Sequence, residues 1–460
     1  MTTVAKAELK SLTALQKELH IPEHDEEEMA SNFYNEFIRS TWYTNALVKF
    51  KASYSDNQVD FTCPEPCGFL VYSELRQELP EISVKEEFSE IVRIAWTPSI
   101  AFNCINKAKL TMGDVDLMNL NNIAIDKYYQ YCREIGFERD LQEAVGDVDI
   151  LTNFTDYLPA YPTICVQPWL YNDNPKKLPM FNDIGKSVIH SYVLRNKITS
   201  LLRMQRLEGD RWVNVKPDLS VLNGIPSDKR LPPPEFWGRI TTNFRPELNI
   251  YRCEEKINIY YKDYVTITSD NPEVMGKKVP ITNMSNRPAR AFWWVAQNQE
   301  ALANNYHSNY TTDPDDRQLG HSPLKAFSLT HGSQLVKYED MDMEHFRLIE
   351  PMKHFKSSPM YKGYGCHSIS LYPLKVNDVS LSLGDLNTNF SVTLGNTDVM
   401  ASRRPIMVES TYKIHFTMLV QRKLTLERDK TSPRSAPRYN VYLDMPEPRM
   451  NPDEEVDLEV

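Results

Sequence analysis

The sequence predicts an all-β protein made of two consecutive antiparallel sandwiches, and three observations support this fold class. The 460 residues include 24 Tyr, 18 Phe and 7 Trp, and 30 Pro stand against only 15 Gly. This composition is typical of strands joined by long loops that contain proline. Apolar and polar residues also alternate along many short segments. These segments form two series, and two series of this length indicate two sandwiches or barrels.

The first 40 residues differ from the rest of the chain. Leu9, Leu12, Leu15 and Leu19 recur at helical spacing, with Lys and Glu between them. A second helix candidate over about 26–39 begins in an acidic run, and negative charge at a helix start complements the helix dipole. We therefore expect an N-terminal helical arm over residues 1–40.

The first strand series predicts a sandwich over residues 41–268. FLVYSEL and SEIVRIAW show apolar-polar alternation, and PTICVQPWL and LNIYRCEEKINIYYKDYVTIT continue the series of strands. The segment IAIDKYYQYCREIGF interrupts the series and predicts a helix over about 121–135. LPPPEFWG predicts a loop, because proline cannot donate the hydrogen bonds of a central strand.

The second strand series predicts a sandwich over residues 275–425. It includes RAFWWVAQN, LKAFSLTHGSQLVKY, short strands between 369 and 394, and the long strand TYKIHFTMLVQRKLTL. In that strand one face carries five apolar residues and should lie in the core, while the other should meet solvent or an interface. The apolar face is Tyr412, Ile414, Phe416, Met418 and Val420, and the opposite face is Lys413, His415, Thr417 and Gln421.

The two adjacent tryptophans of this series, Trp293 and Trp294, follow Phe292 in a dense aromatic cluster. Such a cluster stacks bases or glycans in some proteins, but alternating aromatics in a strand more often fill a sandwich core. We expect one tryptophan in the core and the other against loops or a neighbouring subunit.

Residues 427–460 predict a charged, proline-rich C-terminal tail that is extended and partly disordered. Basic residues lead into its first half, and they favour contact with membrane phosphates or an acidic partner, or else a solvated charge run. They are Arg422, Lys423, Arg428, Lys430, Arg434 and Arg438.

Composition excludes several classes of protein. The net charge of −10 provides no global basic field for direct nucleic-acid binding. The opening MTTVAKAELKSL lacks the apolar core of a signal peptide, and no run reaches the length of a membrane-spanning helix. Seven Cys, an odd number, favour reduced thiols in a cytosolic folding compartment over a disulfide framework.

No catalytic, cofactor-binding or metal-binding residue is predicted. Cys63 and Cys67 have a spacing that suits zinc, but a second Cys pair is missing, so we expect a proline-stiffened loop with two thiols. His20 and His24 are separated by Pro22 and do not share a helical face. The sequence has no HxH pair of the cupin type, no phosphate-binding glycine loop and no GxSxG elbow, and therefore predicts a protein that is not an enzyme.

Five segments in the same order resemble the double jelly-roll major capsid protein family of nucleocytoplasmic large DNA viruses, and iridovirus-like capsid proteins in particular. They begin with IAWTPSIAFNCINKAKLTMGDVDL and QPWLYNDNPKKLPMFNDIG. LNIYRCEEKINIYYKDYVTITSDNPEVM is similar to the closing strand of the first jelly roll, and RPARAFWWVAQN to an opening strand of the second. The stretch 344–394 matches with few gaps, and the resemblance spans roughly 41–425.

The resemblance implies a structural capsid protein that forms pseudo-hexagonal homotrimers, which tile the icosahedral shell of a large DNA virus. It implies contacts with neighbouring capsomers, with minor capsid or penton proteins and with an inner viral membrane. It also implies a place in the virion capsid after synthesis and assembly in the host cell cytoplasm. Two alternatives are a double jelly-roll scaffold or minor capsid protein that shapes an immature viral membrane, and a carbohydrate-binding β-sandwich protein.

Overall fold

The computed structural model describes most of both expected sandwiches. The described residues are 43–55, 57–63, 69–134, 136–173, 188–243, 256–281, 288–331, 334–338, 343–375, 381–382, 388–395, 410–431 and 439–444. The expected N-terminal helical arm, the segment with His20 and His24, and most of the expected tail lie outside these residues.

Two facing sheets form the first half of the chain. The first sheet has the order β1 (Tyr43–Lys49), β15 (Glu235–Asn243), β4 (Phe69–Leu79) and β10 (Tyr161–Cys165). The second has the order β2 (Lys51–Ser55), β3 (Gln58–Thr62), β11 (Val188–Leu194), β7 (Ile105–Met112) and β8 (Val115–Asn121). Two small sheets extend this half: β13 (Arg211–Val215), β12 (Leu202–Glu208) and β6 (Val92–Trp96), and β14 (Leu222–Asn223), β5 (Ile82–Val84) and β9 (Tyr157–Leu158).

Two facing sheets also form the second half. One has the order β16 (Lys256–Thr268), β25 (Thr411–Arg428), β19 (Pro288–Asn298) and β22 (Tyr364–Ser368). Short strands join it: β17 (Glu273–Val274) and β26 (Tyr439–Leu443) pair with β25, and β23 (Leu381–Ser382) pairs with β19. The other sheet has the order β18 (Lys278–Ile281), β24 (Thr388–Leu394), β20 (Leu324–His331) and β21 (Gln334–Tyr338).

The two halves repeat one strand order. The eight principal strands of the first half are β1, β3, β4, β7, β8, β10, β11 and β15, and those of the second are β16, β18, β19, β20, β21, β22, β24 and β25. When each set is counted along the chain, both halves have sheets of order 1-8-3-6 and 2-7-4-5. This is the antiparallel arrangement of a jelly roll. The expected mostly antiparallel β fold is confirmed, and we call the halves the first and second roll.

Short helices fill the connections. In the first roll they are η1 (Glu86–Phe88), α3 (Ile100–Asn103), α4 (Asn122–Cys132), α5 (Glu138–Val145), α6 (Asp149–Thr152), α7 (Leu170–Asp173), η2 (Ile198–Ser200) and η3 (Leu219–Val221). In the second they are α8 (Gln299–Ala303), the π-helix η6 (His345–Ile349) and α9 (Glu350–His354). Helix α4 matches the helix expected over 121–135. No helix in the described part of the chain is both long and apolar enough to cross a membrane.

Three local expectations differ from the structure. Strand β16, expected to close the first roll, pairs along its whole length with β25 of the second. Strand β22 ends before Ile369 and Leu371, which were expected in a strand, and the helical segment of η6 and α9 precedes it. Part of the expected tail, β26, is a strand whose Tyr439 is buried against β25.

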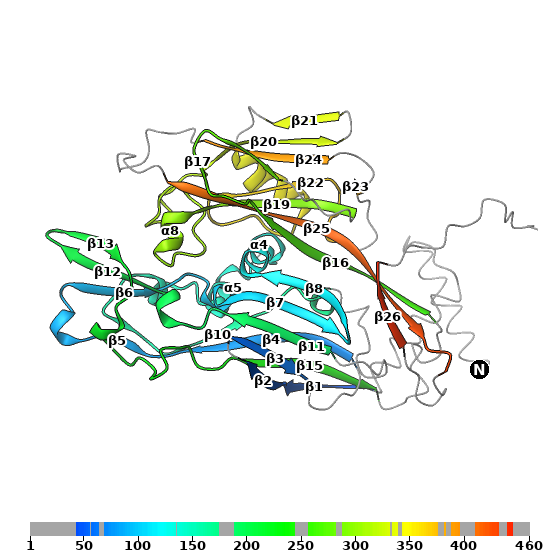
Figure 1. Ribbon diagram of the computed structural model, residues 1–460, viewed down its shortest axis with the longest axis horizontal. Coiled ribbons are helices and arrows are strands. Elements are labelled where there is room, and N and C mark those ends of the chain that lie inside the picture. The colour runs from blue at the N-terminus through cyan, green and yellow to red at the C-terminus, as the bar shows by residue number, and fades with distance from the viewer. Residues whose placement is uncertain are drawn as a thin grey trace, which may run out of the picture.

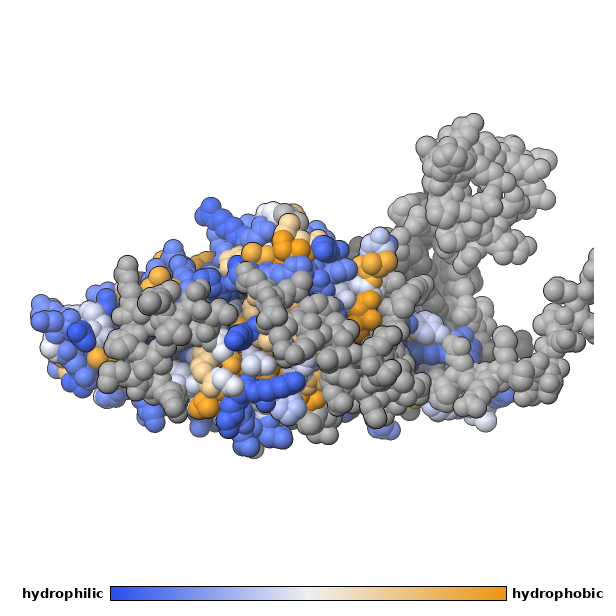
Figure 2. All heavy atoms as spheres, turned by 90° about the horizontal axis from the view of Figure 1, so that it is seen from above, coloured by the Kyte–Doolittle hydropathy of each residue, from blue (hydrophilic) through white to orange (hydrophobic). Residues whose placement is uncertain are grey.

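The rolls pack against each other through α4, which lies between them in Figure 1, while β1 and β15 lie on the side of the first roll away from the second. Seen from above, the face over the second roll is mostly hydrophilic, with apolar residues gathered in a few separate patches (Figure 2). Inside the second roll, Phe390 contacts Phe292, Trp294 and Phe416 in an aromatic core.

Candidate functional site

Helix α4 lies between the two rolls and contacts both of them. The side chain of Asn121 caps its start by accepting a hydrogen bond of 2.8 Å from the Ala124 amide. Ten of the eleven helix residues are buried, and only Tyr128 is partly exposed. A helix this enclosed has neighbours on every side. In α4 those neighbours are the first roll below and the sheet of β16, β25 and β19 above.

Lys127 of α4 connects the helix to the second roll. Its Nζ donates hydrogen bonds to the Trp293 carbonyl at 3.3 Å, the His415 carbonyl at 2.8 Å and the Thr417 hydroxyl at 3.0 Å. The side chain is fully buried, and this burial lowers the pKa of Lys127 well below its ordinary value. Three oxygen acceptors satisfy the three donors of the ammonium group.

Aromatic rings surround this contact. Tyr131 of α4 stacks on Trp293 with ring centroids 5.2 Å apart, and Tyr264 of β16 stacks on Trp293 at 5.6 Å. Trp294 points the other way, into the core of the second roll, where it contacts Phe327 and Phe390. Trp294 is therefore the tryptophan that was expected in the core. The expectation that the other meets loops or a neighbouring subunit is wrong, because Trp293 is buried against α4 of the same chain.

The polar face of β25, expected at solvent or an interface, is an interface within the chain. His415 and Thr417 are buried under α4. The His415 ring hydrogen-bonds with Gln297 Oε1 at 3.1 Å through Nε2 and with Thr268 Oγ1 at 3.0 Å through Nδ1. Burial lowers the pKa of His415 to about 3, so this ring is neutral at physiological pH.

Asp126, next to Lys127, binds a different part of the second roll. Its carboxylate accepts hydrogen bonds of 2.9 Å from the hydroxyls of Tyr310 and Tyr364. Burial raises the pKa of Asp126 to about 6, while both tyrosines act in the opposite direction by stabilising the carboxylate. Two neighbouring helix residues thus fix α4 to two separate segments of the second roll.

The loop after α8 extends the junction over the first roll. Asn305 Nδ2 donates to the carbonyls of Thr199 at 2.8 Å and Leu202 at 2.7 Å. The Asn103 side chain donates to Ser308 Oγ at 2.7 Å. Since these acceptors and donors come from both rolls, the loop restrains their relative position.

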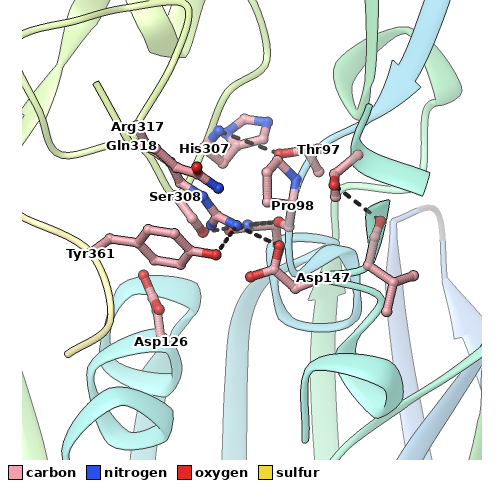
Figure 3. Close-up of polar contacts among 12 residues, drawn as sticks. Thr97, Pro98, Asp126, Asp147, His307, Ser308, Arg317, Gln318 and Tyr361 are labelled. Atoms are coloured by element: carbon pink, nitrogen blue, oxygen red, sulfur yellow. Dashed lines mark hydrogen bonds and ion pairs between the residues drawn. The ribbon is translucent and has the colours of Figure 1, made fainter. Parts of the chain in front are cut away.

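Arg317, in the same loop, forms a buried ion pair with Asp147 at 2.6 Å (Figure 3). Its guanidinium also donates to the Tyr361 hydroxyl at 2.8 Å and lies 3.7 Å from the centroid of that ring. Asp147 belongs to the first roll, whereas Arg317 and Tyr361 belong to the second. Burial alone would lower the pKa of Arg317, but Asp147 and neighbouring tyrosines outweigh it and hold the pKa above its ordinary value.

A polar cavity of about 690 Å³ lies beside this ion pair. Its walls come from α5, α6 and the loop that carries Arg317, and they include Arg139, Glu143 and Asp316. In the part of the chain that the structure describes, no three His, Cys, Asp or Glu side chains are grouped to hold a metal ion. The walls offer charge and hydrogen bonds but no paired nucleophile and base.

The cysteines and tail residues singled out in the sequence have mixed outcomes. Cys63 is half-buried, but Cys67 lies outside the described residues, so the loop interpretation of this pair stays a prediction. Arg422, grouped with the basic tail, is instead buried: it contacts Asp263 at 3.2 Å, Asp444 at 2.9 Å and the Leu117 carbonyl at 3.1 Å. The reason is that β25 extends through Arg428, so Arg422 belongs to the sheet.

Sequence reasoning missed Asp126, Lys127 and Arg317. One signal was available for the first two, since adjacent charges in IAIDKYYQYC interrupt a helix that is otherwise apolar and aromatic. No comparable signal marked Arg317, which lies in a polar loop.

The sequence and the structure of this chain were compared with those of known proteins. No family model matches the chain. In sequence it is 21% identical over 394 residues to the major capsid protein of Tipula iridescent virus, a match that covers 78% of this chain and 81% of that protein. In structure it is similar to the Faustovirus major capsid protein, with a TM-score of 0.63 at 8% identity over 91% of this chain and 97% of that one. The PBCV-1 virus capsid chain gives a TM-score of 0.61 at 12% identity, over 83% and 94%.

The chain has the double jelly-roll fold. The solved structures establish this fold, and the iridescent virus relative is a major capsid protein, in agreement with the family that the sequence resembles. These similar proteins are structural components of virus capsids rather than enzymes. In this chain, the junction at α4 sets the relative position of the two rolls.

Replacing Asp147 with Ala should lower the free energy of unfolding by about 3–5 kcal/mol, because Arg317 would remain as a buried charge without its carboxylate. Adding Arg317→Met to that variant should recover a substantial part of the loss. Urea unfolding of the four members of this double-mutant cycle measures both effects. Arg139→Ala is the control, since its ion pair with Glu143 is exposed and should contribute less than about 0.5 kcal/mol. Equal losses in the single and double variants would contradict the ion-pair account.

Asp126 should make stability depend on pH. Its pKa is raised from 3.8 to about 6 in the folded state, so the folded state binds its proton more tightly than the unfolded state does. This stabilising contribution is complete below pH 4 and is lost as the pH rises through 6. The unfolding free energy of the wild type should therefore fall by about 2.4 kcal/mol relative to Asp126→Asn between pH 4 and pH 7.

The measurement is urea unfolding of both proteins across that pH range. Asp114→Asn, in the exposed turn between β7 and β8, is the control and should track the wild type at every pH. A constant difference between wild type and Asp126→Asn would mean that Asp126 titrates alike in the folded and unfolded chains.

Proposed function

We propose that the chain forms homotrimeric capsomers with pseudo-hexagonal outline, and that these tile an icosahedral shell. The observation that carries this proposal is the repeated strand order, 1-8-3-6 and 2-7-4-5, in both rolls. Because each chain offers two similar lobes, three chains around one axis offer six. Six similar lobes give a unit that fits among equal neighbours on a hexagonal lattice.

The rigid junction supports this assembly. A ring of six lobes closes only if the angle within each chain matches the angle between chains. Lys127, Asp126 and the Arg317–Asp147 pair restrain the angle within the chain. We infer that the contact within the chain and the contact between chains are alike in geometry, with the trimer contact large and the contacts between capsomers smaller.

We propose a division of the chain at the linker before β16. The first roll then spans 43–243 and the second 256–428, in place of the 41–268 and 275–425 that the sequence suggested. The pairing of β16 with β25 over thirteen residues supports this boundary. The arm at 1–40 and the remainder of the tail lie beyond both rolls.

We also propose the partners that such a shell needs: neighbouring capsomers, minor capsid or penton proteins, and an inner viral membrane, with assembly in the host cell cytoplasm. The net charge of −10 disfavours direct contact with nucleic acid. A scaffold role has no observation in its favour over the shell. Trp293 and Trp294, the aromatic pair that suggested carbohydrate binding, are both buried and offer no surface to a glycan.

Purified protein should be a trimer in solution. Size-exclusion chromatography with light scattering should give three times the 53.4 kDa mass of one chain. A stable monomer at micromolar concentration would count against the capsomer.

Deletion of residues 1–38 should leave trimers intact and impair their association into larger arrays. An apolar stripe such as Leu9, Leu12, Leu15 and Leu19 is rarely left in water, so we expect the arm to bind beneath the capsomer or on a neighbour. Light scattering tests the trimer, and electron microscopy of concentrated samples tests the arrays. A truncated protein that cannot form trimers would assign the arm to the core of the fold.

A further inference from the structure

The two rolls carry helices at the same topological position. Helix α4 follows β8, the fifth principal strand of the first roll, and precedes β10, the sixth. The continuous segment of η6 and α9 lies between β21 and β22, the fifth and sixth principal strands of the second roll. The two helices are therefore equivalent in the repeated fold.

Their surroundings are not equivalent. Helix α4 is covered by the second roll, whereas η6 and α9 leave Ile349 44% and Met352 70% exposed. Leu371 and Tyr372, in the turn after β22, are 70% and 57% exposed, and the Leu371 carbonyl contacts His354 Nδ1 of α9 at 3.2 Å. We call Ile349, Met352, Leu371 and Tyr372 the α9 patch.

The α9 patch is also basic. Residues 351–375 contain four Lys and two His but no Asp or Glu, in a protein whose net charge is −10. Lys353 and Lys375 are exposed within or beside the patch, and Lys375 Nζ lies 4.3 Å from the centre of the Tyr372 ring. Four exposed apolar side chains with lysines around them are typical of a contact surface rather than of a solvated face.

We propose that the α9 patch binds a second copy of this chain, on the outer face of the sheet of β1, β15, β4 and β10. The proposal rests on the trimer proposed above and names its contact. The template lies within the chain, where α4 packs on the outer face of the corresponding sheet, β16, β25, β19 and β22. A contact that joins the second roll of one copy to the first roll of the next is heterologous, and its repetition closes a ring.

The receiving face has the chemistry that the α9 patch needs. Phe236 and Ile240 point into the first roll, so the alternate residues of β15, Glu235, Trp237 and Arg239, point outward. Across the strands, Leu47 of β1 is paired with Arg239, and Arg239 with Tyr72 of β4. Leu47 is 49% exposed, and Tyr72 and Trp237 are partly exposed.

Charge on this face is mixed. Glu78 at the end of β4 is exposed, whereas Glu235, whose side chain is 43% exposed, pairs with Lys49 and accepts a hydrogen bond of 2.9 Å from Trp237 Nε1. Arg239 is exposed between Leu47 and Tyr72. The match to the α9 patch therefore rests on the apolar and aromatic side chains of Leu47, Tyr72 and Trp237, which suit the apolar side chains of the patch.

The test combines charge insertion with a matched control. Met352→Glu/Leu371→Glu places two carboxylates in the α9 patch, at side chains exposed enough to leave the fold intact. Leu47→Glu places one on the receiving face. Val213→Glu, on β13 and 40% exposed, is the control. Circular dichroism of all variants checks the fold, and analytical ultracentrifugation measures the dissociation constant of the trimer.

The double variant and Leu47→Glu should each weaken the trimer by at least about 30-fold, as expected for a hot spot of 2 kcal/mol, and Val213→Glu should not. If the wild type is trimeric and the double variant is equally trimeric, the α9 contact is wrong and the capsomer stands. If the wild type is monomeric, both the proposed capsomer and the proposed α9 contact are wrong.

A photo-crosslinking residue at position 352 then identifies the receiving face. In the trimer it should form crosslinks between copies to the outward strands β1, β4 or β15. Crosslinks between copies that fall elsewhere would overturn the receiving face. A crosslinker at position 213 should give no dimeric product.

Discussion

Asp126 and Lys127 occupy consecutive positions of one helix, and both are buried where the two rolls meet. A buried charge is tolerated only when its partners stand at hydrogen-bonding distance. For Lys127 those partners are two backbone carbonyls and a hydroxyl of β19 and β25, and for Asp126 they are the hydroxyls of Tyr310 and Tyr364. A rotation of one roll against the other would separate at least one of these sets and leave a charge unpaired. The angle between the rolls is thus set by electrostatics as well as by the apolar packing around Trp293.

This constraint explains why the contact is polar at its centre. An apolar contact of the same area would hold the rolls together but would permit small slides, because dispersion and hydrophobic forces have little direction. Hydrogen bonds to backbone carbonyls fix position along the strand, since each carbonyl of β25 lies at one register with β19. The Arg317–Asp147 pair adds a second buried contact between the rolls, close to Asp126 (Figure 3). In the proposed capsomer the lobes of one chain would have to match those of its neighbours, so a defined angle would matter more than additional stability.

Much of the fold could be predicted because its signals are local. The alternation in TYKIHFTMLVQRKLTL predicted strand β25, and the helical pattern at 121–135 predicted helix α4. What could not be predicted depends on pairing in space. Strand β16 has the pattern of any strand, and only its partner β25 assigns it to the second roll. Tyr439 lies in a charged, proline-rich stretch that gives no strand pattern. It belongs to strand β26 because its ring is buried and its backbone pairs with the edge of β25. Lys127 escaped notice because a lysine on a helix is usually solvated.

The repeated fold also accounts for the difference between its two equivalent helices. Helix α4 packs against the second roll of its own chain, so this contact forms during folding. Its aromatic rings and charged side chains are therefore buried in the folded chain. Among the residues that the structure describes, no second roll covers the outer side chains of η6 and α9, and in the proposed assembly this surface would meet water before copies associate. Its apolar side chains are accordingly few, and lysines surround them. A surface of this composition binds less tightly per unit area than a folded core does. In the proposed trimer, the repeated roll would therefore form two contacts of similar geometry and different strength, one within the chain and one between copies.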